Sequence, residues 1–315
     1  MQYRKLGSSD LEVSAIGLGA WGLGDDHWGE VDEENSIAII RAAIDSGINF
    51  IDTAQPYGSG KSEQLIGKAI KGYDRSKIII GDKCGSKRIP GGYRRDWRPP
   101  VIRGMLEQSL KDLQTDYIDL YQMHWPNDES PLKDAFIEMN RMREEGLVRH
   151  IGVSNFSVEQ IAEAQLYCPI VSLQPQYSIL HRAIEKELAP YCVKNDIGII
   201  SYGSIASGVL SGKYTERPIF EPSDPRGRIY AAYYSEENWP KTDAMVGALR
   251  QLADKYNCPV VHVAIGWVLA REGIAVAICG ARTPQQVSVN AQAADLNLSS
   301  QDIAFIDAKY HEIYG

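Results

Sequence analysis

An eightfold alternation of strand-like and helix-like segments constrains this chain more than any other feature. Short apolar runs typical of buried strands are each followed by a segment whose apolar residues recur at helical spacing. The predicted strands are 14–19, 49–53, 77–83, 117–124, 149–154, 171–174, 197–202 and 275–280. Eight β-then-α units of this length are typical of an α/β fold, the closed (β/α)8 or TIM barrel.

Helical patterns follow the predicted strands, and further segments lie outside the repeat. The helical patterns lie near 33–46, 62–71, 100–113, 131–145, 157–166, 183–195, 241–257 and 284–292. Residues 3–13 predict an N-terminal β-hairpin cap, and residues 300–310 predict an extra C-terminal helix. No Pro-, Gly- or Ser-rich linker divides the chain, so we expect one domain over residues 1–315. Long loops at 84–98 and 204–240 follow strands, where such barrels place specificity.

Charge and hydropathy argue against several classes of function. A formal net charge of -8 argues against general binding to nucleic acid or to membrane surfaces. No apolar run is long enough to span a bilayer, and residues 1–5 do not lead into a signal-peptide core. The five cysteines are scattered and lack C-x-x-C spacing, which indicates reduced thiols. We therefore expect a cytoplasmic protein that acts on a small molecule, and the sequence does not define its oligomeric state.

Four proton-handling residues lie at or just after the ends of three consecutive predicted strands. Asp52 and Tyr57 follow the second strand, Lys83 closes the third and His124 closes the fourth. Because the carboxyl ends of barrel strands meet at one mouth, we expect these side chains to converge without a metal ion. The alternative is a lone buried ion pair between Asp52 and Lys83, with the other two as ordinary strand-end residues.

Such a group would suit acid catalysis at a carbonyl. A free phenol has a pKa of about 10, and an adjacent ammonium favours the phenolate. Lys83 would therefore make Tyr57 a usable proton donor, while Asp52 keeps Lys83 charged. His124 would hydrogen-bond the substrate oxygen and help to stabilise negative charge that develops there.

A phenolic acid at a carbonyl also requires a hydride source, which points to a nicotinamide cofactor. The segment 277–286 ends a predicted strand and opens a helix, with Thr283 as N-cap and Pro284 in the first turn. A helix N-terminus binds anions, and Arg282 beside it suits the 2′-phosphate of NADP. The alternative is an ordinary capped helix with an exposed arginine.

Two glycine-rich motifs resemble nucleotide-binding loops but fail on position. Residues 17–22 match G-x-G-x-x-G, yet polar residues up to 31 separate them from a helix that can begin only at Asp32, so a Rossmann unit is disfavoured. Residues 58–62 resemble the end of a P-loop, but its first glycine would fall on Gln55.

Two loops carry aromatic residues whose role the sequence leaves open. The basic stretch 87–98 is better explained as a solvated loop than as a binding surface, because the chain is acidic overall. In the loop at 204–240, an aromatic cluster either forms a pocket wall or packs the loop onto the barrel: Tyr230, Tyr233, Tyr234 and Trp239.

With these residues identified, the chain resembles the aldo-keto reductase family over nearly its whole length. The matching segments are 17–21, 52–63, 117–126, 151–156 and 280–290. The resemblance implies a (β/α)8 barrel that binds NADP(H) at its carboxyl end and reversibly reduces aldehydes or ketones to alcohols. It also implies Tyr57 as the general acid and Asp52, Lys83 and His124 as the other catalytic residues.

The resemblance further implies a set of cofactor contacts. Gly19, Ala20, Trp21 and Asp52 would lie near the nicotinamide, with Ser154, Asn155 and Gln174 at its carboxamide and Tyr202 under its ring. Gly203, Ser204, Ile205, Ser207, Gly208 and Lys213 would surround the pyrophosphate, and Arg226 would cover the cofactor. Gly280, Arg282, Gln286 and Asn290 would take the 2′-phosphate and adenine.

Within the family the chain is most similar to bacterial stress and sugar-aldehyde reductases, and less so to potassium-channel β subunits. The second resemblance implies an alternative function, a cofactor-sensing interaction subunit with little turnover. Ser207 stands where some bacterial relatives carry arginine, which bears on the preference for NADPH over NADH. Neither the substrate nor the direction of the reaction follows from the sequence.

Overall fold

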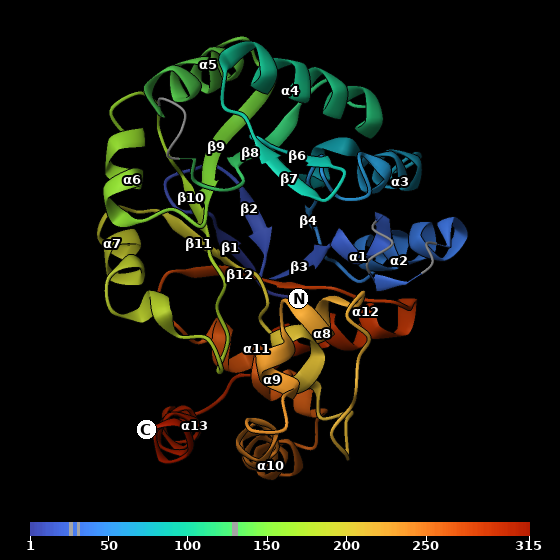
Figure 1. Ribbon diagram of the computed structural model, residues 1–315, viewed down its shortest axis with the longest axis vertical. Helices are drawn as coiled ribbons and strands as arrows, with labels where there is room; N and C mark the ends of the chain where they lie inside the picture. Colours follow the sequence, from blue (N-terminus) through green and yellow to red (C-terminus); the bar gives the residue numbers. More distant parts are fainter. Residues whose placement is uncertain (25–27, 30–31, 128–131) are drawn as a thin grey trace.

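The protein folds around a closed barrel of parallel strands, as predicted. The computed structural model describes residues 1–24, 28–29, 32–127 and 132–315 (Figure 1). Within these residues the strands close in the order β10-β11-β12-β3-β4-β5-β8-β9. The barrel strands are β3 (Ile16–Gly19), β4 (Phe50–Asp52), β5 (Ile79–Cys84), β8 (Ile118–Met123), β9 (Val148–Ser154), β10 (Ser172–Gln174), β11 (Gly198–Ser201) and β12 (Ile274–Cys279).

Helices surround this barrel on all sides in Figure 1, with α2 to α7 forming an arc and α10 to α13 covering the remaining side. Their bounds are α2 (Glu33–Asp45), α3 (Lys61–Ala69), α4 (Pro99–Leu113), α5 (Leu132–Glu144), α6 (Val158–Ala164), α7 (Leu188–Lys194), α10 (Trp239–Tyr256), α11 (Val260–Leu269), α12 (Pro284–Gln292) and α13 (Ser300–Tyr314). Short 3-10 segments are η2 (Arg75–Lys77), η3 (Ala183–Glu185), η4 (Ala206–Ser211) and η5 (Ala293–Asp295). None of the described helices is both long and apolar enough to cross a bilayer.

Several elements were not predicted from the sequence. One is helix α11, which is buried from Val261 to Leu269. Instead of a loop, residues 84–98 contain an antiparallel hairpin of β6 (Ser86–Ile89) and β7 (Gly92–Arg95). The segment 204–240 holds η4 and two short helices, α8 (Pro225–Arg228) and α9 (Ala231–Tyr234). A four-residue helix, α1 (Trp21–Gly24), also precedes α2, which begins at Glu33 as the helical pattern predicts and has Asp32 as its N-cap.

Alternation along the strands determines which side chains enter the barrel. Successive residues of a strand point to opposite faces. In β5, Ile79 belongs to the apolar core inside the barrel and Ile80 to the core beneath the helices. The same alternation directs Lys83 inward and Asp82 outward. Gly81 leaves room for the Phe50 ring, since a Cβ there would lie 2.8 Å from that ring.

The predicted N-terminal hairpin is confirmed and closes the amino end of the barrel. Strands β1 (Tyr3–Lys5) and β2 (Glu12–Ser14) pair antiparallel. Leu6 and Val13 are completely buried in the core inside the barrel, together with Phe50 and Leu120. The hairpin therefore supplies the apolar floor of the barrel.

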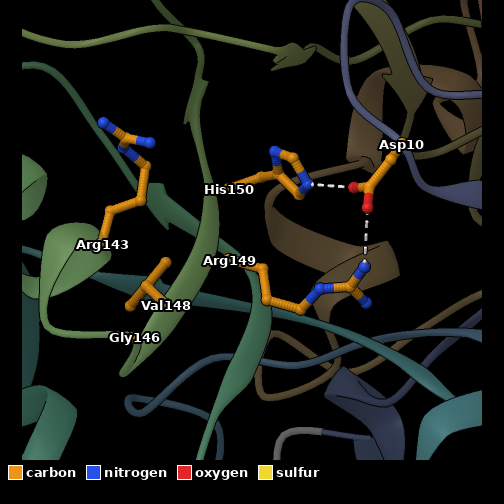
Figure 2. A pocket seen from close by; sticks show the side chains of 6 residues that line it. All are labelled: Asp10, Arg143, Gly146, Val148, Arg149 and His150. Carbon is orange, nitrogen blue, oxygen red and sulfur yellow. Dashed lines mark hydrogen bonds and ion pairs between the residues drawn. The ribbon is translucent and has the colours of Figure 1, made fainter.

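A shallow, charged pocket lies on the outside of this amino end (Figure 2). The Asp10 carboxylate bridges His150 Nε2 at 2.6 Å and the Arg149 guanidinium at 3.2 Å. Arg149 also binds the buried Asp119 at 3.0 Å, so these surface charges tie the hairpin to the start of β9. The polar side chains that line this pocket are thus largely bonded to one another.

Candidate active site

Asp52, Lys83 and Tyr57 meet just inside the carboxyl end of the barrel. Lys83 Nζ donates to Asp52 Oδ1 at 2.7 Å and to the Thr53 carbonyl at 2.9 Å, and it lies 3.4 Å from Tyr57 Oη. The Lys83 side chain is only 1% exposed. A lysine ammonium this well buried needs such partners, because an unpaired charge would be costly to desolvate. The phenol therefore contacts the ion pair directly.

His124 completes the cluster from the next strand. Its ring lies 5.9 Å from the Tyr57 ring, centroid to centroid, and nearly perpendicular to it. The backbone N–H of His124 donates to the backbone carbonyl of Cys84 at 3.1 Å, which fixes the backbone beside Lys83. Its Nδ1 atom is buried without a hydrogen-bond partner among the described residues. A buried ring nitrogen with this unused capacity is available to a ligand.

The environment sets the protonation of both groups. Burial raises the pKa of the Tyr57 phenol well above its ordinary value, and the Asp52 charge acts in the same direction. Burial, with the positive charges of Lys83 and Arg95, lowers the pKa of His124 well below 6.5. At neutral pH the site therefore holds a protonated phenol and a neutral imidazole.

This outcome differs from the expectation that Lys83 lowers the pKa of Tyr57. The Lys83 ammonium lies closer to Asp52 than to the phenol, 2.7 Å against 3.4 Å, and the Asp52 charge acts against ionisation of the phenol. Desolvation of the phenolate then dominates. The raised pKa therefore keeps the Tyr57 phenol protonated at neutral pH.

A chain of amides and hydroxyls extends the cluster across the barrel mouth. Gln174 Nε2 donates to Asp52 Oδ1 at 2.8 Å, and the backbone carbonyl of Gln174 accepts from Ser154 Oγ at 2.8 Å. Asn155 Nδ2 donates to Ser154 Oγ, and Asn155 Oδ1 accepts from Tyr202 Oη at 2.9 Å. These polar residues therefore hold Tyr202 in a fixed relation to the ion pair.

A cavity of about 1020 Å³ opens above these residues. This volume lies at the upper end of what small-molecule and cofactor sites require. Every predicted site residue lines it except Ala20 and Lys83. Ala20 is completely buried and donates its N–H to the Asp52 carbonyl at 2.9 Å, so it supports the strand end. Lys83 lies beneath the cavity and contacts it through Tyr57.

The loop after β11 forms one end of this cavity with an unusual backbone. Ala206, Ser207 and Gly208 follow one another at positive φ. Strained conformations of this kind persist at ligand sites, where successive backbone amides can bind anions. Ser207 Oγ is buried without a partner among the described residues, and the Lys213 ammonium lies against Gly208. This end of the cavity fits a phosphate-bearing ligand.

The N-terminus of α12 forms a second anion-binding end. The predicted cap is confirmed, since Thr283 Oγ1 accepts from the Gln286 N–H at 3.2 Å and Pro284 stands in the first turn. The Arg282 side chain donates to the Gly22 carbonyl at 3.3 Å and forms no ion pair with a described residue. Its guanidinium thus keeps donors for a phosphate. Asn290 Nδ2 lies 3.4 Å from the Gly280 carbonyl and so connects α12 to the end of β12.

Arg226 is less available than Arg282. It lines the cavity, but it donates to both carboxylate oxygens of Asp224, at 2.9 and 2.5 Å. Its guanidinium also lies 4.2 Å from the Phe220 ring centroid. The Asp224 carboxylate therefore satisfies much of its charge before any ligand binds.

The two glycine-rich motifs at residues 17–22 and 58–62 have other roles in the structure. Lys61, in the segment that resembles a P-loop, donates to Glu33 at 2.6 Å. Ser62 Oγ lies 2.9 Å from Thr53 Oγ1. The closed barrel also excludes an open Rossmann sheet around residues 17–22. Neither glycine-rich segment serves as a nucleotide loop in its usual form.

Sequence reasoning missed part of the cavity wall. Tyr93 and Arg95 of the β6–β7 hairpin line the cavity, so the basic stretch 87–98 is not merely a solvated loop. Trp28 and Trp125 line it as well. Of the late aromatic cluster, Tyr230 forms part of the wall, whereas Tyr234 packs the loop by donating to the Ser207 carbonyl. A basic and aromatic composition close to a strand end was the one available signal.

Comparison with known proteins decides the family. A model of the Aldo/keto reductase family matches residues 15–311. This chain belongs to that family. It is 38% identical over 304 residues to the aldo-keto reductase YhdN of Bacillus subtilis (strain 168), covering 96% of this chain and 91% of that one.

Two further relatives bear on the cofactor and the fold of this aldo-keto reductase. A protein of Escherichia coli (strain K12) named NADH-specific methylglyoxal reductase is 33% identical over 313 residues, covering 94% of each chain. The solved structure of a glycerol dehydrogenase from Gluconobacter oxydans is 32% identical, with a TM-score of 0.91, covering 99% of this chain and 95% of that one. The family consists of oxidoreductases that use nicotinamide cofactors, and membership alone does not decide between NADPH and NADH.

Proposed function

We propose that this protein reduces aldehydes or ketones to alcohols with NADPH, and that Tyr57 is the proton donor. The observation that carries the proposal is the 3.4 Å contact between the Tyr57 phenol and Lys83, at the base of a cavity with two anion-binding ends. The cofactor's part is to supply a hydride to the carbonyl carbon when it is bound. The remaining chemistry belongs to side chains of this chain.

Tyr57 transfers its proton to the carbonyl oxygen as negative charge develops there. The raised pKa of the free phenol means that the resulting phenolate needs stabilisation, which the Lys83 ammonium supplies. Asp52 keeps that ammonium charged and oriented through the 2.7 Å contact. In the oxidative direction the phenolate removes the same proton from the alcohol.

His124 orients the substrate. As a neutral imidazole it donates a hydrogen bond to the carbonyl oxygen, next to the Tyr57 proton. Protonation at low pH would place a second cation beside Lys83, and burial disfavours this. We therefore assign His124 to positioning and charge stabilisation rather than to proton transfer.

The choice of cofactor rests on Arg282. A guanidinium that forms no ion pair with a described residue, beside a helix N-terminus, suits the 2′-phosphate that distinguishes NADPH from NADH. Arg282→Gln should lower kcat/KM for NADPH by about tenfold or more, as loss of a charge-assisted contact predicts, with much less effect on NADH. Equal losses with the two cofactors would contradict the NADPH assignment.

The direct test is the loss of NADPH absorbance with an aromatic aldehyde. Tyr57→Phe should lower the rate by about 10²- to 10⁴-fold, the range of general acid catalysis, with nearly unchanged NADPH binding. Circular dichroism and fluorescence titration would establish folding and binding. Folded protein without turnover over a broad panel of carbonyl compounds would refute the proposal.

A further inference from the structure

We infer that the preferred substrates are carbonyl compounds that carry a carboxylate, and that Arg95 binds this carboxylate. The inference deepens the proposed function and rests on it. It begins from the β6–β7 hairpin, which places Arg95 and Tyr93 on the wall of the cavity. This hairpin is part of the long segment after β5, where barrels of this kind build specificity.

A continuous series of rings connects Arg95 to the reacting groups. Its guanidinium lies 5.7 Å from the Trp125 ring centroid. Trp125 stacks on His124 with 6.1 Å between ring centroids, and His124 in turn packs against Tyr57. A ligand whose carbonyl oxygen meets Tyr57 and His124 would therefore extend across Trp125 toward Arg95. An aromatic ring between the two ends of the ligand suits such a wall.

The Arg95 guanidinium is held in place without being neutralised. Arg95 Nη1 donates to the Pro126 carbonyl at 2.7 Å. The nearest acid along the chain, Asp96, instead accepts two hydrogen bonds from Arg98, at 2.9 and 2.6 Å. Arg95 forms no ion pair with any residue in the described ranges. Within the part of the chain that the structure describes, its other donors therefore have no carboxylate partner, and they suit a planar, bidentate acceptor such as a substrate carboxylate.

The cavity itself carries an excess of positive charge. Of the described residues that line it, Asp52 is the one carboxylate, and Lys83 and Gln174 already bind it. The basic residues of the same lining are Lys213, Arg226, Arg228, Arg282 and Arg95. Arg282 and Lys213 lie at the two ends assigned to the cofactor phosphates, whereas Arg95 lies on the Trp125 side, beside His124. Its charge is thus left for the substrate.

A matched pair of aldehydes tests the inference. 4-Carboxybenzaldehyde and methyl 4-formylbenzoate share a ring and a carbonyl, and they differ in the negative charge. We expect the wild-type protein to prefer the acid in kcat/KM by about tenfold or more, because of the charge-assisted bidentate contact. The preference should appear mainly in KM and should shrink as salt is added, since Arg95 is exposed.

Neighbouring arginines provide the matched variants. Arg95→Gln should reduce the acid-to-ester ratio of kcat/KM to about one, the value expected without the charge contact. Arg94→Gln removes the same charge from the preceding residue of β7, which does not line the cavity, and should leave the ratio unchanged. Equal use of the two aldehydes by the wild-type protein, or an equal loss of the ratio in both variants, would overturn the inference.

A binding measurement separates this inference from the proposed reaction. With NADPH present, 4-(hydroxymethyl)benzoate should raise the melting temperature of the wild-type protein more than its methyl ester does, and Arg95→Gln should abolish that difference. If neither aldehyde is turned over, the proposed function fails, while the melting shifts still decide whether Arg95 binds carboxylates. Equal shifts by the two alcohols would exclude the carboxylate site.

Discussion

At the amino end of the barrel, Leu6 and Val13 are completely buried against other apolar side chains. At the carboxyl end, the most buried groups include Lys83 and Asp52, which are ionic and held by three or fewer partners each. Folding removes the apolar side chains of the barrel floor from water, which stabilises the fold. At the barrel mouth, folding removes charged side chains from water, and the ion pair only partly offsets the free-energy cost.

This difference divides the expected effects of mutation. Substitutions in the floor should change the free energy of unfolding and leave the chemistry of folded molecules alone. Substitutions at the mouth should change catalysis, and they should change stability only where a charge loses its partner.

Lys83→Met should have the largest effect, because it leaves Asp52 buried without its cation. We expect a loss of about 3–5 kcal/mol in the free energy of unfolding, as for other broken buried ion pairs. The rate of aldehyde reduction should fall by at least about 10²-fold, since the phenolate loses its ammonium. Urea denaturation and steady-state kinetics measure the two effects.

The double variant Asp52→Asn/Lys83→Met is the control for this prediction. Removing both charges should restore most of the lost stability, because no uncompensated charge remains, while activity stays low. If the double variant is as unstable as the single one, then packing rather than charge makes Lys83 important. The mouth would then resemble the floor.

Leu6→Ala should give the second-largest effect, on stability alone. Removing this fully buried side chain should cost about 2–5 kcal/mol, the range for leucine-to-alanine changes in cores. The kcat of the folded protein should stay within about twofold of wild type, because the hairpin lies at the opposite end from Tyr57. Leu166→Ala, at a leucine that is 75% exposed, should change stability by less than about 0.5 kcal/mol. A large change in kcat would break the separation of floor and mouth.

Glu63→Gln should show an effect that depends on pH. Glu63 in α3 is completely buried, and neither carboxylate oxygen has a hydrogen-bond partner among the described residues. Burial raises the pKa of Glu63 well above its ordinary value, and burial also raises the pKa of Asp82, which faces it. Because the folded-state pKa is raised, the carboxyl contributes its full stability below the unfolded-state pKa of about 4.5 and loses it as the pH rises above that value.

A glutamine cannot ionise, so it does not lose stability in this way. Near pH 4 the variant should match wild type within about 0.5 kcal/mol, and near pH 8.5 it should be more stable by about 1–3 kcal/mol. Melting temperatures across this range measure the difference. Parallel curves for the two proteins would show that Glu63 is not a buried acid that resists ionisation.

Asp10→Asn should give the smallest effect. Asp10 is mostly exposed, and its hydrogen bond with His150 lowers its pKa. A lowered folded-state pKa means that its contribution is present above about pH 4 and is lost at lower pH. Exposed ion pairs contribute about 0.5 kcal/mol, and salt screens them. A loss above about 2 kcal/mol at neutral pH, measured by denaturation, would mean that the charges in Figure 2 support the floor.

The sequence predicted those parts of the fold whose pattern and burial agree. The eight barrel strands were found to within about two residues, because their Ile- and Val-rich runs are buried on both faces. Helix α11 was missed because Val260–Leu269 is apolar almost throughout, so no polar face marks its helical period. The β6–β7 hairpin was missed because its exposed residues do not alternate between apolar and polar.

For the candidate site, the sequence located the strand ends but not the surroundings of each side chain. The order of the strands was enough to bring Asp52, Lys83 and Tyr57 together. The pKa direction of Tyr57 was predicted wrongly, because it depends on burial and on which partner Lys83 lies closer to. The position of Arg95 on the cavity wall depends on the twist of a hairpin that local pattern does not encode.

The opposite directions of Asp82 and Lys83 make this enzyme sensitive to insertions as well as to substitutions. A slip of one residue in β5 would turn a carboxylate into the barrel and a lysine toward the Glu63 carboxyl. All the original amino acids would still be present, yet the barrel would hold two facing carboxylates and no ammonium. An insertion of one residue between Ile79 and Lys83 should therefore remove the ammonium from the site, whereas an insertion beyond Cys84, where the hairpin begins, leaves the register of β5 intact.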